Sequence, residues 1–280
     1  VDTYVEGIHF IDFKKPDLVI KKILRSSISD LICKGVKPKY YFISGSGNSK
    51  TFSRINLDKI SRSLKQEQNK FNLSLCGGDT VLSNKLSFTI TTIGFSKKII
   101  FRNKAKLNDD IYVTGYLGDS FAGLTLKKKG IKTTKIMSEY FEKKYYLPEL
   151  HLNLSEKLFK FANTSIDLSD GLFADLEKLI NDQNFSYVLY LKDIPISKNL
   201  KKLLDLKKFK KEDFISRGDD YQILFTADSS KSKTINKTAK SLGIKISKIG
   251  KICSNSLKSG IVDKKGDKIA INYKGYHHIF

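Results

Sequence analysis

Helix-like and strand-like hydrophobic patterns alternate along both halves of this sequence, and this alternation limits the folds open to the chain. Residues 17–34 carry apolar side chains at helical spacing. Residues 85–95 (KLSFTITTIGF) are rich in β-branched and aromatic residues, which favour a strand. The polar, aperiodic segment 101–110 separates the two halves. The sequence therefore predicts two α/β-type domains, 1–104 and 105–280.

The same patterns predict most of the remaining secondary structure. Further strands are expected at 1–10, 40–46, 111–115, 186–191, 221–227 and 243–252. Further helices are expected at 56–69, at 121–130, within 127–145, and from Ser169 or Asp170 onward. The chain starts at Val1, inside the first expected strand, so we expect that an N-terminal segment is missing.

The charge of the chain is strongly positive but is carried almost entirely by lysine. There are 46 Lys and 5 Arg among 280 residues, and the formal net charge is +22. Base-reading and phosphate-clamping surfaces rely on Arg, whereas these lysines are spread along the whole chain, so we expect no specific nucleic-acid binding. The positive field should attract anionic, phosphate-bearing ligands. No apolar stretch approaches the roughly 18–20 residues that span a bilayer, so no membrane segment is expected.

The cysteines Cys33, Cys76 and Cys253 lie far apart and show no C-x-x-C spacing. This spacing disfavours a structural zinc site and favours a reduced, cytoplasmic protein.

The segment IDLSDGLFADLEKLI (166–180) places Asp167, Ser169 and Asp170 directly before an apolar helical stripe. One of these residues can be explained as a helix N-cap. Two neighbouring carboxylates repel each other unless a cation lies between them, and Mg²⁺ accepts one or two carboxylates together with substrate phosphates. For this segment alone, a cap and a metal site are equally good interpretations.

Carboxylates beside glycines or strand ends recur elsewhere in the chain. They occur in VDTYVEGIHF (Asp2, Glu6, His9), SSISDLICKG (Asp30), CGGDT (Asp79) and RGDDYQILF (Asp219, Asp220). A single Asp in such a place is usually a turn former. Several together favour a phosphate site with more than one metal ion. The sequence has no P-loop motif and no kinase-type glycine loop, so ATP would be held through carboxylate-bound magnesium.

The sequence resembles the thiamine-monophosphate kinase family over essentially its whole length. The resemblance rests on segments that occur in order at matching separations: VDTYVEGIHF, SISDLICKGVKP, CGGDT, YVTGYLGDSFAGL, IDLSDGLFADL, GDDYQILFT and GYHHIF. The family belongs to the aminoimidazole-ribonucleotide-synthetase superfamily, whose members use ATP and magnesium. Asp219 and Gln222 stand where the family usually has Glu, Thr-Arg does not follow GGDT, and the family's GDDAA-type segment does not precede Val1.

The resemblance implies an α/β (α+β), two-domain PurM-like fold. An N-terminal mixed sheet with helices would form a dimer interface, and a C-terminal α/β sandwich domain would follow. ATP as co-substrate, thiamine monophosphate and several Mg²⁺ ions would bind between the domains. Matching positions imply metal ligands at Asp2, Asp30, Asp79, Asp167 and Asp170, ATP contacts at Gly78, Arg102 and Ser169, and substrate contacts at His9, Asp219 and Tyr276. His9, Arg102 and Tyr276 also have simple structural or surface interpretations.

The expected reaction is direct phosphoryl transfer from ATP to the phosphate of thiamine monophosphate. That oxygen is already anionic near neutral pH, so no protein nucleophile or strong general base is required, and magnesium would reduce the repulsion between the polyanions. Two alternatives remain. A sister ATP-dependent synthetase would need a different acceptor pocket, and a basic RNA-binding module would bind RNA in a salt-sensitive way.

Overall fold

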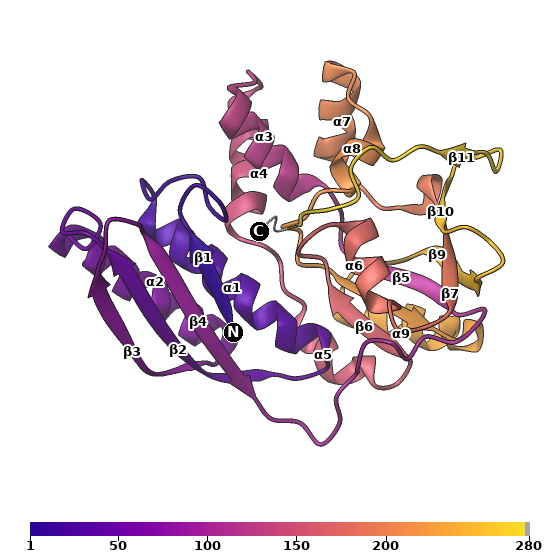
Figure 1. The fold of residues 1–280 in the computed structure, drawn as a ribbon, viewed down its shortest axis with the longest axis horizontal. Coiled ribbons are helices and arrows are strands. Elements are labelled where there is room, and N and C mark those ends of the chain that lie inside the picture. Colours follow the sequence, from indigo (N-terminus) through magenta and orange to yellow (C-terminus); the bar gives the residue numbers. More distant parts are fainter. Residues whose placement is uncertain (278–280) are drawn as a thin grey trace.

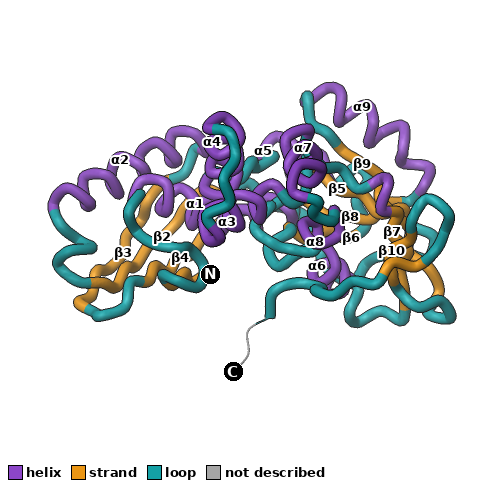
Figure 2. Tube along the Cα trace, turned by 90° about the horizontal axis from the view of Figure 1, so that it is seen from above, coloured by secondary structure: helices purple, strands orange, loops and turns teal. Residues whose placement is uncertain are grey.

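The computed structural model describes residues 1–277, and each half of the chain forms its own β-sheet (Figure 1). The first sheet has the order β1-β4-β2-β3, with β1 (Asp2–Val5), β2 (Pro38–Gly47), β3 (Ser74–Leu82) and β4 (Ser87–Gly94). β2 and β3 run parallel and the other pairs antiparallel, so this sheet is mixed. Helices α1 (Pro16–Cys33) and α2 (Arg54–Phe71) lie on one face of it, and no helix of residues 1–277 covers the opposite face (Figure 2).

The second half forms a larger mixed sheet flanked by helices. Its order is β11-β10-β7-β9-β5-β8-β6, and β7–β10 is the parallel pair. The strands are β5 (Asp110–Thr114), β6 (Thr164–Asp167), β7 (Phe185–Tyr190), β8 (Ile223–Ala227), β9 (Ile246–Ser254), β10 (Gly260–Val262) and β11 (Lys268–Ile269). The helices are α3 (Asp119–Lys129), α4 (Lys135–Tyr146), α5 (Leu152–Leu158), α6 (Leu172–Leu179), α7 (Lys198–Lys207), α8 (Lys211–Ile215) and α9 (Ser232–Leu242). Short 3₁₀ turns cover Leu191–Asp193 and Ser229–Lys231.

Helix α1 joins the two halves. Pro16 suits its first turn because the N–H that proline lacks has no partner inside a helix there. The apolar stripe of α1 packs on β4, and the helix also contacts β6, α4 and α5 of the second half. One hydrophobic cluster therefore runs from Ile20 and Ile28 of α1 to Tyr145 and Phe225 of the second half. Burial of this apolar surface holds the halves in a fixed arrangement.

Most predicted elements are confirmed. The helices expected at 17–34 and 56–69 are α1 and α2, and the strands expected at 40–46 and 85–95 are β2 and β4. The α/β (α+β) class and the mixed N-terminal sheet are also confirmed. The CGGDT segment was not expected to be a strand. It lies in β3. Parallel hydrogen bonding to β2 holds this segment extended, although its glycine-rich sequence does not favour a strand.

The two sheets are connected by residues 95–109, which include the proposed division between residues 104 and 105. Within residues 1–277 none of the helices combines the length and apolarity that crossing a membrane requires. The last three residues of the GYHHIF segment, 278–280, lie outside the described part of the chain.

Candidate active site

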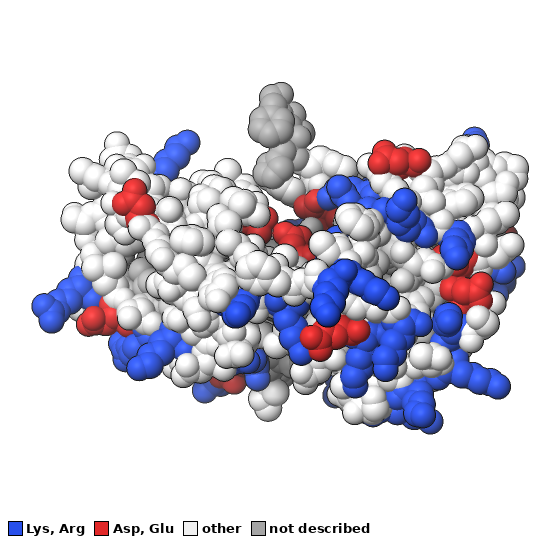
Figure 3. Space-filling model, turned by 90° about the horizontal axis from the view of Figure 1, so that it is seen from below, with Lys and Arg blue, Asp and Glu red and all other residues white. Residues whose placement is uncertain are grey.

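A cleft of about 840 Å³ lies between the two halves of the chain. Its walls come from β1 and the turn after it, α1, α3, the loops at 167–170 and 217–221, and the segment before the C-terminus. Figure 3 shows acidic side chains gathered around a hollow in the middle of the molecule, with Lys and Arg side chains on the surface beside it. The lining residues include Asp2, Asp30, Asp167, Asp170 and Asp219, all of which were predicted site residues.

Asp30 and Asp167 face each other across the junction of the two halves. Asp30 lies near the end of α1, and Asp167 is the last residue of β6. Ser29 Oγ donates a 2.5 Å hydrogen bond to Asp167 Oδ2 and so connects α1 to β6. Burial, reinforced by the charge of Asp2, raises the pKa of Asp30 to about 6. Burial and the charge of Asp30 raise the pKa of Asp167 to about 7. Such shifts indicate carboxylates that are held close together in a site poor in water.

Asp2 adds a third carboxylate to this wall of the cleft. It begins β1, where backbone pairing with Ile90 of β4 fixes its position. Its Oδ2 atom is buried and accepts no hydrogen bond within the described structure. A buried carboxylate oxygen without a donor costs free energy unless a ligand compensates its charge. This orphaned oxygen beside Asp30 fits a cation.

A magnesium ion suits this arrangement better than a metal that needs a complete protein cage. Over residues 1–277, no three Asp, Glu, His or Cys side chains converge closely enough to hold a metal ion by themselves. Magnesium keeps several waters and binds through one or two carboxylates together with substrate phosphates. The pair Asp30 and Asp167, with Asp2 beside it, matches that requirement.

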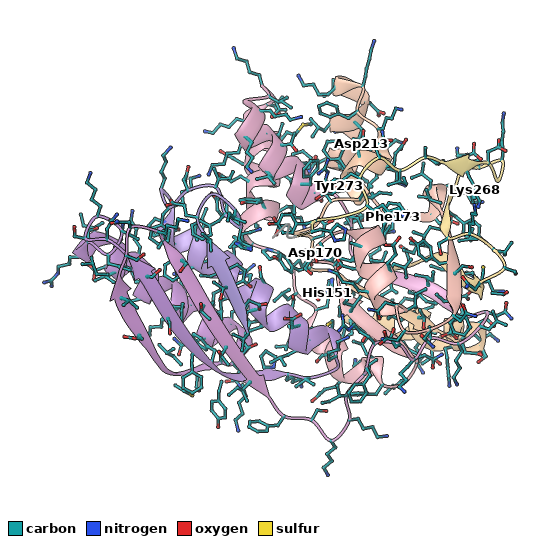
Figure 4. The ribbon with its side chains drawn as sticks, in the orientation of Figure 1. His151, Asp170, Phe173, Asp213, Lys268 and Tyr273 are labelled. Carbon is teal, nitrogen blue, oxygen red and sulfur yellow. The ribbon has the colours of Figure 1, made fainter. Side chains whose placement is uncertain are left out.

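The loop at 168–171 presents Asp170 to the cleft but does not use it as a helix cap (Figure 4). Helix α6 begins at Leu172, and its N-cap is Gly171, which makes no side-chain cap hydrogen bond. Instead, Asp175 Oδ2 accepts hydrogen bonds from the backbone N–H groups of Asp170 (2.9 Å) and Gly171 (3.0 Å). The expectation that Ser169 or Asp170 begins the helix is therefore wrong. Asp170 forms an ion pair with Lys178 and keeps 29% of its side chain exposed.

Glycines allow this loop to lie against the loop at 216–219. Gly171 has φ 125°, and a Cβ atom there would lie 2.2 Å from the carbonyl oxygen of Ser216. A Cβ on Gly218 would lie 1.9 Å from the carbonyl oxygen of Ser169. Only glycine permits such an approach of two backbones. The contact places Ser169 and Asp219 side by side, and Asp219 N–H donates to the Ser169 carbonyl at 2.9 Å.

Asp219 forms an ion pair with a buried lysine of α1. Lys22 Nζ lies 3.1 Å from Asp219 Oδ2, and only 1% of the Lys22 side chain is exposed. Tyr221 Oη donates to Asp219 Oδ1 at 3.0 Å. Asp219 and Tyr221 both have positive φ, 72° and 51°, which is a strained conformation for residues with side chains. Strain of this kind is characteristic of functional sites.

The other two predicted substrate contacts, His9 and Tyr276, also line the cleft. His9 Nδ1 accepts a hydrogen bond from the backbone N–H of Val5 at 3.0 Å, which fixes the turn after β1. The backbone N–H of Tyr276 donates to the carbonyl oxygen of Asp170 at 3.0 Å, so the C-terminal segment is tied to the loop of Asp170.

Three predicted residues lie elsewhere. Gly78 and Asp79 lie on β3, the edge strand of the first sheet, and Arg102 is exposed in the segment that connects the sheets. None of the three belongs to the described lining of the cleft. Within one chain, the structure does not bring Asp79 to the other four predicted metal ligands.

Sequence reasoning missed two basic residues of this region: Arg217, which lines the cleft, and Lys22, which lies buried behind it and pairs with Asp219. Lys22 lies among Val19, Ile20 and Ile23 on the most buried side of α1. A lysine within an apolar helical stripe must be buried, and this position could have indicated that Lys22 pairs with a carboxylate inside the protein. Arg217 had no comparable local signal, because the rings that it contacts come from distant segments.

Comparison with known proteins agrees with this architecture. The family model described as "AIR synthase related protein, N-terminal domain" matches residues 1–96. A solved structure described as "AaThiL complexed with AMPPCP and TMP" superposes with a TM-score of 0.86 at 24% identity, covering 99% of this chain and 85% of that one. The mixed N-terminal sheet, the second α/β half and the acidic cleft between them define a protein with a PurM-like fold, and the AIR-synthase-related match covers its first sheet.

Relatives that match over most of their length identify the particular family. The thiamine-monophosphate kinase of Buchnera aphidicola subsp. Acyrthosiphon pisum (strain APS) is 34% identical over an alignment 284 residues long, which covers 99% of this chain and 85% of that protein. The crystal structure of thiamine-monophosphate kinase from Stenotrophomonas maltophilia K279a is 27% identical, with a TM-score of 0.83 and coverage of 96% of this chain and 84% of that one. The chain belongs to the thiamine-monophosphate kinase family.

Proposed function

We propose that this protein transfers the γ-phosphate of ATP to thiamine monophosphate and releases thiamine diphosphate and ADP. Family membership supports this reaction, and a protein of the same fold has been solved with AMPPCP and TMP. The single observation that carries the proposal is the acidic wall of the cleft. Asp30 and Asp167 lie there with raised pKa values, and a buried Oδ2 atom of Asp2 beside them has no hydrogen-bond donor within residues 1–277.

The chain's own residues would bind and orient the two substrates rather than form a covalent intermediate. The acceptor oxygen of a phosphate monoester is anionic near neutral pH, so the site needs no strong general base. Asp2, Asp30, Asp167 and Asp170 would hold magnesium, which when bound neutralises phosphate charge and stabilises the transition state. Lys178 holds Asp170 in place at the rim of the cleft.

Substrate roles follow from the lining of the cleft. His9, Asp219 and Tyr276 are proposed acceptor contacts because all three line the same cavity. Ser169, on the loop between Asp167 and Asp170, is a proposed nucleotide contact. Gly78 and Arg102 remain proposed nucleotide contacts, and Asp79 a proposed metal ligand, on the family resemblance alone.

The first sheet also supports a homodimer. β3 is an edge strand of the first sheet. Strands β2 and β3 at this edge carry four exposed apolar residues: Phe42 (41% exposed), Leu75 (41%), Val81 (53%) and Leu82 (86%). An exposed, apolar edge strand is a surface that pairs with another chain. We therefore propose that two copies associate through this apolar patch of β2 and β3. The domain division at 104/105 and a cytoplasmic location remain predictions from the sequence.

Product formation from defined substrates tests the proposed reaction. Thiamine monophosphate, ATP and MgCl₂ should yield thiamine diphosphate and ADP in equal amounts, and EDTA should abolish both. Aminoimidazole precursors in place of thiamine monophosphate should give no ADP. Turnover of those precursors without turnover of thiamine monophosphate would instead establish the sister synthetase activity.

A further inference from the structure

Arg217 lies in the cleft on a platform of aromatic rings. Its guanidinium carbon is 3.3 Å from the centroid of the Tyr273 ring and 5.0 Å from that of Phe121. Phe121 belongs to α3, and Tyr273 belongs to the C-terminal segment beside Asp170 (Figure 4). All three residues line the cavity. Stacking on an aromatic ring restricts a guanidinium while leaving its N–H groups at the edge of the plane for a ligand.

Arg217 has no carboxylate partner among the described residues of the chain. Over residues 1–277, no carboxylate forms an ion pair with Arg217, and its buried Nε atom has no hydrogen-bond partner. Lys128 and Lys129 line the same cavity, and neither forms an ion pair with a described residue. A buried, charged N–H group without an acceptor is costly, so this part of the cleft is arranged for an anion.

The nearest acidic residue in sequence does not serve as the missing acceptor. Asp219 is only two positions from Arg217, but Lys22 and Tyr221 engage its two carboxylate oxygens. The other carboxylates that line the cleft are engaged elsewhere. Asp170 forms an ion pair with Lys178, and Asp30 and Asp167 interact with each other across the junction of the two halves, with Asp2 beside them. The cleft therefore has an acidic region suited to cations and a separate basic region around Arg217.

We infer that Arg217, stacked on Tyr273, is a phosphate-binding residue that contacts a phosphate group of one of the two substrates directly, without a metal ion. A phosphate group is the matching anion because its oxygens accept the parallel hydrogen bonds of a guanidinium. The inference deepens the proposed function and rests on it. The phosphate belongs either to the acceptor or to the nucleotide, and pairs of ligands that differ only in phosphate distinguish the two.

Isothermal titration calorimetry with two ligand pairs tests the inference. The first pair is thiamine monophosphate and thiamine, and the second is AMPPCP and adenosine. Arg217→Gln should weaken binding of the phosphorylated member of one pair by about tenfold or more, the loss expected for a charge-assisted bidentate contact. Binding of the unphosphorylated member should not change. Which pair responds identifies the substrate that Arg217 contacts.

Two further variants separate phosphate recognition from a general loss of charge or structure. Arg217→Lys keeps the charge but not the planar fork, so its loss of affinity should be smaller than that of Arg217→Gln. Arg62→Gln removes the same charge from an exposed position on α2 and should bind both phosphorylated ligands like wild type. Thermal melts of each variant establish that the protein is folded.

The outcomes are decisive in both directions. An Arg217→Gln protein that binds thiamine monophosphate and AMPPCP as tightly as wild type overturns the inference, as does wild-type protein that binds neither. Wild-type protein that binds both ligands but forms no thiamine diphosphate refutes the proposed reaction and leaves the role of Arg217 intact.

Discussion

The Nζ atom of Lys22 lies 3.1 Å from Oδ2 of Asp219, and this contact joins the core of α1 to the lining of the cleft. Lys22 Nζ also donates to the carbonyl oxygen of Tyr145 at 3.1 Å and lies 4.1 Å from the centroid of the Tyr145 ring. Burial lowers the pKa of Lys22, while the charge of Asp219 opposes that change. Asp219 therefore favours the charged form of this buried lysine.

Replacing Lys22 tests whether this pair positions Asp219. Lys22→Met should raise the KM for thiamine monophosphate more than it lowers kcat, because Asp219 loses the cation that fixes its carboxylate. The free energy of unfolding should fall by about 1–3 kcal/mol, less than for a fully buried pair, since 29% of the Asp219 side chain is exposed. The double variant Lys22→Met/Asp219→Asn should regain part of that stability in urea denaturation. A double variant whose losses simply add would show that the two residues are not coupled.

Asp170→Asn should abolish phosphoryl transfer without unfolding the protein. Asp170 lines the cleft, whereas the first turn of α6 depends on Asp175, which binds the N–H groups of Asp170 and Gly171. We expect kcat to fall by about 100-fold or more, the scale of losing one electrostatic contact to a transition state. The melting temperature should stay close to that of wild type.

Asp205→Asn is the matched control for this substitution, because Asp205 is exposed on α7. Its kcat should equal that of wild type. An Asp170→Asn protein that is unfolded by circular dichroism, or one that is fully active, would refute the assigned role.

The local spacing of apolar residues was sufficient to predict the helices and strands that bury one face. The apolar spacing of α1 predicted a helix at 17–34, and the structure has it at Pro16–Cys33. The recurring aspartates and the family resemblance indicated Asp2, Asp30, Asp79, Asp167 and Asp170, and the structure brings all of these except Asp79 to one cleft. These residues were recognisable because each lies at the end of a strongly patterned element or in a short motif.

Contacts between distant segments were not predictable in the same way. The start of α6 is decided by Asp175, which reaches back one turn, and by the backbone of Ser216, which requires glycine at 171. The stacking of Arg217 on Tyr273 depends on where the C-terminal segment crosses the cleft. Neither relationship leaves a periodic signal in the sequence.

Asp220 should make the stability of the protein depend on pH. Burial raises the pKa of this carboxyl to about 8, although Gly118 N–H and Ser120 N–H donate hydrogen bonds to it. The ordinary value for Asp is about 3.9, so the folded state binds the proton more tightly than the unfolded state. Stability should therefore fall as pH rises from about 4 to about 8, with a limiting slope of about 1.4 kcal/mol per pH unit.

Urea denaturation at pH 5 and pH 8 measures this effect. Asp220→Asn removes the titrating group while keeping an acceptor for the N–H of Gly118. The variant should lose less stability than wild type between the two pH values. Equal losses in both proteins would show that Asp220 does not titrate in this range.

For the buried ion pair between α1 and α2, removing one partner should destabilise the protein more than replacing both partners with apolar residues. Arg25 donates to both carboxylate oxygens of Glu67, at 2.7 and 2.9 Å, and both side chains are at least nine-tenths buried. Glu67→Gln leaves the guanidinium uncompensated and should lower the free energy of unfolding by about 3–5 kcal/mol. Arg25→Met/Glu67→Leu, which replaces both charges with apolar groups, should lie closer to wild type. Chemical denaturation of the three proteins tests this order, and a double variant weaker than Glu67→Gln would contradict it.

Val81 tests the proposed dimer. It lies on the edge strand β3 with 53% of its surface exposed, within the apolar patch of β2 and β3. Val81→Lys should convert a dimer to a monomer in size-exclusion chromatography with light scattering, because burying an unpaired ammonium at an interface is costly. Leu206→Lys changes an exposed leucine on α7, outside the first sheet, and should leave the mass unchanged. If wild type is monomeric at micromolar concentration, or if Val81→Lys stays dimeric, this patch is not the interface. A Val81→Lys protein that is both monomeric and inactive would further indicate that residues of β3, such as Asp79, act in the cleft of the other copy.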